Sequence, residues 1–235
     1  MPATRLLRIL GLLGDGGAGG SRLCEVAAEA VGVTGAGLML LSHDLPVGSV
    51  CTTDAVSARI EDLQYTLGEG PCVDAHRLGR AVTEPDLAGL GPGRWPAFTG
   101  PAVDAGARAV FGFPTTVGGA RLGALNLYRD QPGGLTDDQH ADALVMAEVA
   151  ARAVLALQSE ASAGNLAGDI EAEGEFRFVV HQAAGMVSEQ LHISVTEALV
   201  RLRAHAFRRG RTLADVANDV VARSLRFDEM GGDDR

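Results

Sequence analysis

Arginine is concentrated in one short stretch near the end of the chain. Five arginines fall within residues 201–211, and no aspartate or glutamate lies among them. Arg201 and Arg208 are seven residues apart with His205 between them, so a helix would carry all three on one face. A guanidinium offers a planar fork of donors that suits phosphate oxygens and base edges. The pattern favours an anion-binding face over an ordinary solvated helix face. The basic residues of this stretch are Arg201, Arg203, His205, Arg208, Arg209 and Arg211.

This stretch is basic within an otherwise acidic chain. The 235 residues carry a net charge of −10. Residues 175–227 contain eight arginines and five acidic residues, a balance of +3, which leaves −13 for the remainder. The bulk charge excludes nucleic-acid binding by general attraction, and the asymmetry predicts an acidic body joined to a basic interaction module.

Three short amphipathic helices would position the basic residues. Ser194 followed by Glu197 has the spacing of a capping box at the start of the second helix. Gly210 is typical of the residue just past a helix end, and Thr212 followed by Asp215 would start the third helix. Three such helices can bury one small core. Phe207 is expected to belong to it, and the alternative is a stacking surface.

The first 158 residues have a different pattern, in which helical spacing alternates with short apolar runs. Two strands near the middle of the chain are separated by the turn sequence VGGA, and a long helix begins at Thr136. This order predicts an α+β fold with an antiparallel sheet flanked by helices. The expected strands are 35–41, 49–53, 81–84, 108–116 and 121–129.

The predicted organisation has four parts, and none is a membrane span or signal peptide. Three widely spaced cysteines without a CxxC pair indicate neither a disulfide framework nor a metal site, which fits a reducing cytoplasm. No cofactor is expected. The parts are a folded domain at 1–158, a linker at 159–174, a helical domain at 175–228 and a disordered tail at 229–235.

The helical domain resembles the ANTAR domain, the three-helix RNA-binding module of bacterial transcription antiterminators. The resemblance lies in HQAAGM (181–186), ISVTEAL (193–199), LRAHA (202–206) and LADVANDVV (213–221). It implies that the module binds paired stem-loops in nascent RNA and prevents a terminator hairpin from forming.

The resemblance also extends the expected RNA-binding set to the first helix, at His181, Ala184 and Gly185. Many such domains have a basic residue where this chain has Ala184. Three alternatives follow: His181 replaces that charge, RNA binding is weaker, or the RNA target differs. A glycine inside a helix costs about 0.5–1 kcal/mol relative to alanine. Gly185 therefore predicts either a close helix–helix crossing or a close approach of RNA.

The first domain resembles a GAF domain of the type that precedes ANTAR domains in actinobacterial proteins. The phrases are LQYTLGEGPCVDA, RWPAF, RAVFGFP and LGALNLYR. The resemblance implies a pocket for a small-molecule signal, with Glu69, Cys72, Trp95 and Tyr128 as ligand-binding residues. LGEGPC reads equally as a sharp turn. Cys72 is expected to be either a redox thiol or a buried, inert residue.

The resulting hypothesis is a non-enzymatic, signal-responsive antitermination regulator that acts as a homodimer, because paired RNA loops need two copies of the module. Two alternatives remain open. A few GAF domains are cysteine-dependent free methionine sulfoxide reductases, and the three cysteines allow that activity here. The basic helices could also bind an acidic protein partner.

Overall fold

The chain folds into two compact units, Met1–Asn165 and Leu166–Arg235. The computed structural model describes residues 2–14, 20–42, 45–90, 93–161 and 171–227. Most of the predicted linker, 162–170, and the predicted tail lie outside the described residues. The helices on either side of 162–170 end at Ala161 and begin at Glu171.

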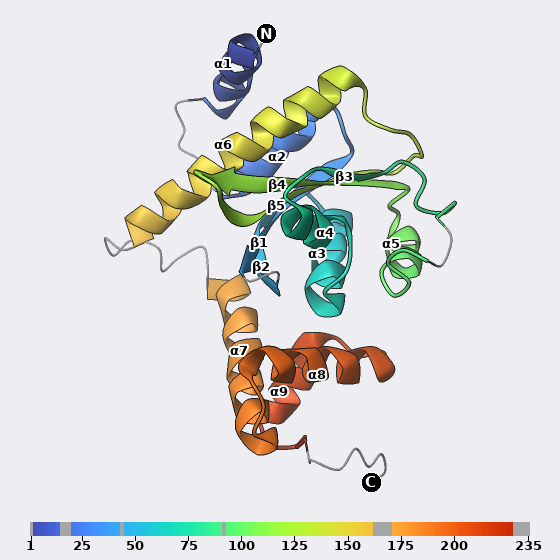
Figure 1. Ribbon diagram of the computed structural model, residues 1–235, viewed down its shortest axis with the longest axis vertical. Coiled ribbons are helices and arrows are strands. Elements are labelled where there is room, and N and C mark those ends of the chain that lie inside the picture. The colour runs from blue at the N-terminus through green and yellow to red at the C-terminus, as the bar shows by residue number, and fades with distance from the viewer. Residues whose placement is uncertain (1, 15–19, 43–44, 91–92, 162–170, 228–235) are drawn as a thin grey trace. The chain divides into compact units, whose positions relative to one another are not determined.

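A five-stranded antiparallel sheet forms the centre of the first unit (Figure 1). The strands lie in the order β2-β1-β5-β4-β3, so β5 is central. This confirms the α+β class and the antiparallel sheet. The strands are β1 (Gly35–Ser42), β2 (Leu45–Thr52), β3 (Val82–Glu84), β4 (Ala109–Val117) and β5 (Ala120–Arg129).

The predicted turn joins β4 to β5. Val117 pairs with Ala120, which leaves Gly118 and Gly119 as a two-residue loop. Both glycines have positive φ, 54° and 84°. Such a turn matches the twist of the flanking strands, and positive φ at both positions is readily adopted only by glycine and a few polar residues.

One face of the sheet is covered by α2 (Gly20–Val31) and α6 (Asp137–Ala161), and α1 (Pro2–Leu13) packs on these two helices. Figure 1 shows α2 and the long α6 against this face. The core between them is apolar and includes Val26, Leu38, Phe111, Leu125 and Met146. Thr136 starts α6 as predicted, because its hydroxyl accepts a hydrogen bond from the Gln139 N–H at 3.2 Å.

The opposite face is covered by α3 (Ala55–Leu67) and α4 (Pro71–Leu78), followed along the chain by α5 (Thr99–Ala105). Asp54 caps α3, accepting from the Ser57 N–H at 2.7 Å. The glycine-rich stretch before Cys72 is a turn only as far as Gly70, which has φ 134°. Pro71 then begins a helix, as proline does readily at a first helical position.

The second unit contains the three predicted helices, α7 (Glu171–Leu191), α8 (Val195–Arg208) and α9 (Leu213–Val221). Ser194 and Thr212 cap α8 and α9 by accepting from backbone N–H groups three residues on, each at 3.1 Å. The buried residues include Val180, Val187, Leu199, Leu202 and Val216.

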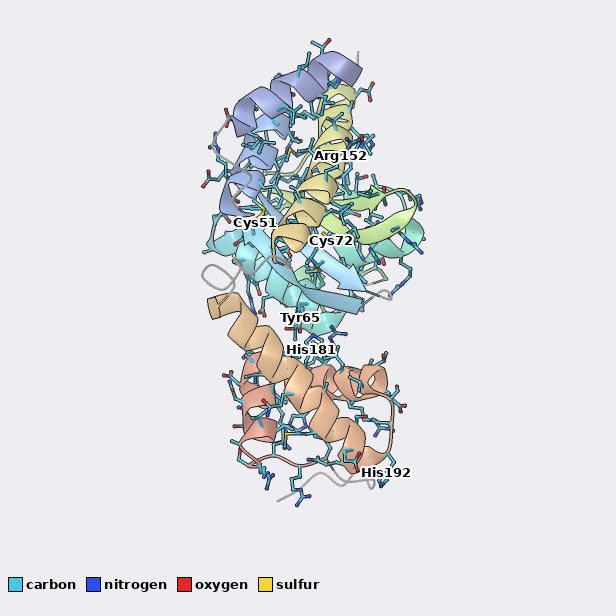
Figure 2. The ribbon with its side chains drawn as sticks, turned by 90° about the vertical axis from the view of Figure 1, so that its left-hand side faces the viewer. Cys51, Tyr65, Cys72, Arg152, His181 and His192 are labelled. Atoms are coloured by element: carbon cyan, nitrogen blue, oxygen red, sulfur yellow. A yellow bond between two sulfur atoms is a disulfide. The ribbon has the colours of Figure 1, made fainter. Side chains whose placement is uncertain are left out.

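One prediction about the cysteines is wrong. Cys24 on α2 and Cys51 on β2 form a disulfide, with their Cα atoms 5.9 Å apart (Figure 2). The linear spacing of 27 residues carried no sign of this pair. The disulfide forms because α2 packs against β1 and the edge strand β2.

Candidate functional site

Helix α8 exposes two of the predicted basic residues on one side. Arg201 and Arg208 both lie at the surface. Arg201 lies 3.5 Å from the Glu197 carboxylate, a weak contact between two exposed side chains. Among the described residues, Arg208 has no ion pair. These two guanidinium groups are available to an external anion.

The other arginines of the stretch do not share that surface. Arg203 is only 6% exposed and lies on the buried side of α8, so it packs within the unit. Arg211 forms an ion pair with Asp219 at 2.7 Å, which ties the start of α9 to its last turn. Arg209 is exposed at the end of α8. The structure therefore separates the predicted basic residues into exposed and internally engaged ones.

The aromatic rings of the second unit also differ from expectation. Phe207, expected in the core, is 56% exposed. His205 is half-buried and packs edge-to-face on Phe227, with ring centroids 5.3 Å apart. His205 therefore helps to hold the segment after α9, whereas Phe207 offers an open stacking surface.

The three predicted contact residues on helix α7 also divide into exposed and buried ones. His181 is exposed (Figure 2). Ala184 is fully buried in the core of the unit, so its side chain is withdrawn from any external contact. Gly185 is exposed, and a Cβ added there would meet nothing within 4 Å. The expectation of a helix–helix crossing at Gly185 is therefore wrong.

Sequence reasoning missed a groove beside Gly185. It has a volume of about 610 Å³. Two arginines that follow α9, Arg223 and Arg226, form part of its wall, and both are exposed. Their presence was visible in the sequence, but no local pattern placed them next to α7. The lining residues are Gln182, Gly185, Met186, Glu189, Gln190, Arg223 and Arg226.

In the first unit, two of the predicted ligand-binding residues are occupied by internal hydrogen bonds. The Glu69 carboxylate accepts from the backbone N–H groups of Ala97 and Phe98, at 2.7 and 2.9 Å. The Trp95 indole N–H donates to the Asp74 carboxylate at 2.9 Å. These contacts hold the loop between β3 and α5 against α4 and the turn that precedes it.

Tyr128 is likewise engaged. Its hydroxyl donates to the Asp54 carboxylate at 2.8 Å. Burial and this hydrogen bond raise the pKa of the Tyr128 hydroxyl. Burial alone would raise the pKa of Asp54, but hydrogen bonds from the Ser57 N–H and the Tyr128 hydroxyl lower it below its ordinary value of 3.8. The pair thus links the start of α3 to the central strand.

Cys72 is fully buried and its thiol is free of disulfide bonding. Its backbone N–H donates to Gln64 at 2.7 Å. Burial, and then the nearby Glu61 carboxylate, raise the pKa of the Cys72 thiol well above its ordinary range. A protonated and inaccessible thiol is a poor nucleophile.

A buried polar residue, Asn126, lies on β5 between two glycines of the neighbouring strands. This central-strand residue pairs with Gly37 on β1 and Gly112 on β4. The absence of side chains at both glycines lets Glu61 of α3 and the Pro71–Cys72 backbone of α4 approach the sheet closely. Asn126 is 1% exposed, and among the described residues its Oδ1 has no hydrogen-bond partner.

In the part of the chain that the structure describes, the four predicted ligand-binding residues do not line a common cavity. A groove of about 600 Å³ in the first unit lies instead between α6 and the β4–β5 hairpin, near Leu144, Val117 and Arg152. Within the described residues, no cluster of three His, Cys, Asp or Glu side chains is arranged to hold a metal ion. Nor is any described helix long and apolar enough to cross a membrane.

Comparison with known proteins assigns the two units separately. Residues 169–221 match the family model of the ANTAR domain. No curated protein gives a significant match to the chain.

The sheet-containing unit has a GAF-like fold. The GAF domain of a Coxiella burnetii phosphoenolpyruvate-protein phosphotransferase gives a TM-score of 0.51 at 15% identity, covering 68% of this chain and 96% of that one. The GAF domain of the Acinetobacter enzyme of that name gives 0.49 at 12% identity, over 69% and 98%. A free methionine-R-sulfoxide reductase from Neisseria meningitidis gives 0.49 at 16% identity, over 68% and 91%.

Proposed function

We propose that this chain, in which an ANTAR domain follows a GAF-like unit, is an RNA-binding regulator that promotes transcription antitermination. The match of residues 169–221 to the ANTAR domain carries the proposal. The exposed guanidinium groups of Arg201 and Arg208 support it, because they supply positive charge on one side of α8. The exposed ring of Phe207 adds a surface on which an unpaired base can stack.

The RNA-binding set is narrower than the sequence indicated. It retains His181, Gly185, Arg201, Arg208 and Arg209, all of which are exposed. Arg203, His205, Arg211 and Ala184 act within the unit through packing or internal ion pairing. RNA stem-loops are the partner, and a homodimer supplies the two modules that paired loops require.

The GAF-like unit is the sensory part of the proposal. A signal must bind two states of this unit unequally in order to shift the activity of the ANTAR domain. We place the protein in the cytoplasm, where nascent bacterial transcripts are made. The four residues first assigned to a ligand pocket serve as structural contacts around α3 and α4, and the signal is left unnamed.

Catalysis is not part of the proposed function. Sulfoxide reduction by a GAF-type enzyme needs a reactive thiolate, whereas Cys72 is buried and its pKa is raised. Cys24 and Cys51 are joined to each other. Turnover of free methionine sulfoxide that disappears in Cys72→Ser would contradict this reading.

The decisive experiment measures RNA binding and terminator readthrough with the full chain. RNAs that crosslink to the protein in cells are identified by sequencing and synthesised by in vitro transcription. Their affinity for the protein is compared with that of a random-sequence RNA of equal length. We expect selective binding and increased readthrough at a terminator downstream of the bound loops. Equal affinity for both RNAs would overturn the proposal and leave an acidic protein as the partner to be sought.

A further inference from the structure

The groove between α7 and the segment that follows α9 has the features of a nucleotide-binding site. We propose that it receives a single unstacked nucleotide from an RNA loop. The inference rests on the proposed RNA-binding function and adds a specific site, separate from the exposed arginines of α8. Three independent features of the groove support it. They are a glycine, an arginine in an unusual backbone conformation, and contacts that fix the segment after α9, which forms one wall of the groove.

Gly185 opens the groove at helix α7. A glycine in a helix interior is unfavourable, yet nothing in the protein requires one here, because an added Cβ would meet no atom within 4 Å. At Gly37, by contrast, an added Cβ would lie 2.7 Å from a side-chain oxygen of Glu61. Internal packing thus explains Gly37 and not Gly185. Space beside the backbone of α7 is what Gly185 provides.

Arg223 lies on the other side of the groove in a backbone conformation that favours glycine. Helices α8 and α9 end in the same hydrogen-bonding motif, in which the two residues after the helix cap donate back to carbonyls of the last turn. At the end of α8 the left-handed position is Gly210, with φ 60°. At the end of α9 it is Arg223, with φ 61°. The conformation is unfavourable for arginine, and the side chain is exposed in the groove.

The wall that carries Arg226 is held in place by contacts on both sides. The Phe227 backbone N–H donates to the side-chain oxygen of Gln190 on α7, at 2.9 Å. The Phe227 ring packs on His205 of α8. These contacts fix the segment after α9 against the bundle, so Arg226 is presented on a supported chain rather than on a free end.

The lining chemistry selects an unpaired nucleotide. Among the described residues, Arg223 and Arg226 have no ion pair, and each can donate to a phosphate or to the acceptor edge of guanine. Gln182 offers an amide to a base edge, Glu189 can accept from an exocyclic amino group, and Met186 supplies apolar contact. Base edges in an RNA duplex are poorly accessible to side chains, whereas a loop base can be turned outward into such a groove.

The test uses the full chain and a pool of RNA hairpins with one fixed stem and randomised loops. The wild-type protein selects its preferred loop from the pool, and affinities are then measured for that hairpin and for a duplex of the same stem without a loop. Two variants probe the groove, Gly185→Leu and Arg223→Gly. Both are expected to fold at least as stably as wild type, because leucine favours a helix and glycine relieves the left-handed position.

We expect each variant to weaken binding of the selected hairpin by about tenfold, the effect of losing one good base or phosphate contact. Duplex affinity depends on general charge, so it should stay within about twofold for Gly185→Leu, which leaves the charge unchanged. For Arg223→Gly, which removes one positive charge, duplex affinity should fall by less than hairpin affinity. Arg152→Ala removes one arginine from the first unit and serves as the charge control, with hairpin affinity unchanged.

The possible outcomes separate the groove from the proposed function. If the wild-type protein selects a loop but both groove variants bind it normally, the groove assignment is wrong and RNA binding by the chain stands. If the wild-type protein selects no loop over the bare duplex, both proposals fail. Loss of hairpin affinity in variants whose thermal midpoints match or exceed that of wild type supports the groove.

Discussion

The Glu61 side chain of α3 lies directly over Gly37 of β1, where a Cβ would be 2.7 Å from one carboxylate oxygen. Gly112 of β4 has an even closer neighbour, since its Cβ would lie 2.4 Å from the backbone carbonyl of Pro71. Asn126 is between the two glycines on the central strand. The close packing of α3 and α4 on this face therefore depends on the absence of side chains at these two glycines of the sheet.

We predict that alanine at these glycines destabilises the first unit in a graded order. Gly112→Ala should lower the free energy of unfolding by roughly 2 kcal/mol or more, because backbone cannot move aside as a side chain can. Gly37→Ala should cost less, since Glu61 is flexible. Urea denaturation monitored by circular dichroism measures both, and equal costs would contradict the contact geometry.

The matched variant in the second unit is Gly185→Ala, for which the structure predicts the opposite sign. The added methyl group meets open space, so only helix propensity changes. We expect the ANTAR domain to gain about 0.5–1 kcal/mol in its free energy of unfolding. A loss of stability in the same denaturation experiment would mean that Gly185 has an internal packing role after all.

The disulfide between Cys24 and Cys51 should contribute measurably to stability. A bond that closes a loop of this length stabilises a fold by roughly 3 kcal/mol, through the restricted unfolded chain. We expect reductant to lower the thermal midpoint of wild type and to leave a Cys24→Ala/Cys51→Ala variant unchanged. Mass spectrometry after alkylation of the unreduced, unfolded protein should find one modified cysteine, Cys72. Three modified cysteines would show that the bond is absent.

Cys72 should resist alkylation as long as the protein is folded. Its thiol is buried and held in the protonated form, which is the unreactive one. We predict that iodoacetamide at neutral pH modifies Cys72 only at the rate of unfolding, so that modification accelerates together with denaturation in urea. Rapid labelling in the absence of denaturant would contradict the burial and restore Cys72 as a redox candidate.

The Asp54–Tyr128 hydrogen bond should make stability depend on acid pH. The folded-state pKa of Asp54 lies below its ordinary value of 3.8, so the ionised form is the one that the fold prefers. The stabilisation is fully present above that value and is lost as pH falls through the folded-state pKa. We expect the wild-type urea midpoint to fall more steeply than that of Asp54→Asn below about pH 4. Parallel curves would mean that the pair does not carry this dependence.

Charge substitutions on α8 should distinguish exposed from buried arginines. Arg208→Glu should weaken RNA binding by roughly tenfold and reduce its salt dependence, with little change in folding. Arg203→Glu should unfold the unit, because it would place a carboxylate on the buried side of α8. If both variants fold and bind alike, the division of this helix into two sides is incorrect.

The sequence by itself determined the features that depend on neighbouring residues. Thr136, Ser194 and Thr212 cap helices where the pattern placed them, because a cap is made with a backbone N–H only a few residues away. The paired glycines of the β4–β5 turn were equally readable, since the turn type fixes the residues it needs.

Only the tertiary structure decided which of two similar residues faces solvent and which distant segments meet. Arg203 is buried and Arg208 exposed, although both belong to one basic stretch. Gly37 carries a close contact and Gly185 none. Cys24 meets Cys51, and Arg223 meets the groove beside α7, through packing of elements far apart in sequence. Such contacts depend on how whole helices and strands pack, and no local spacing encodes that arrangement.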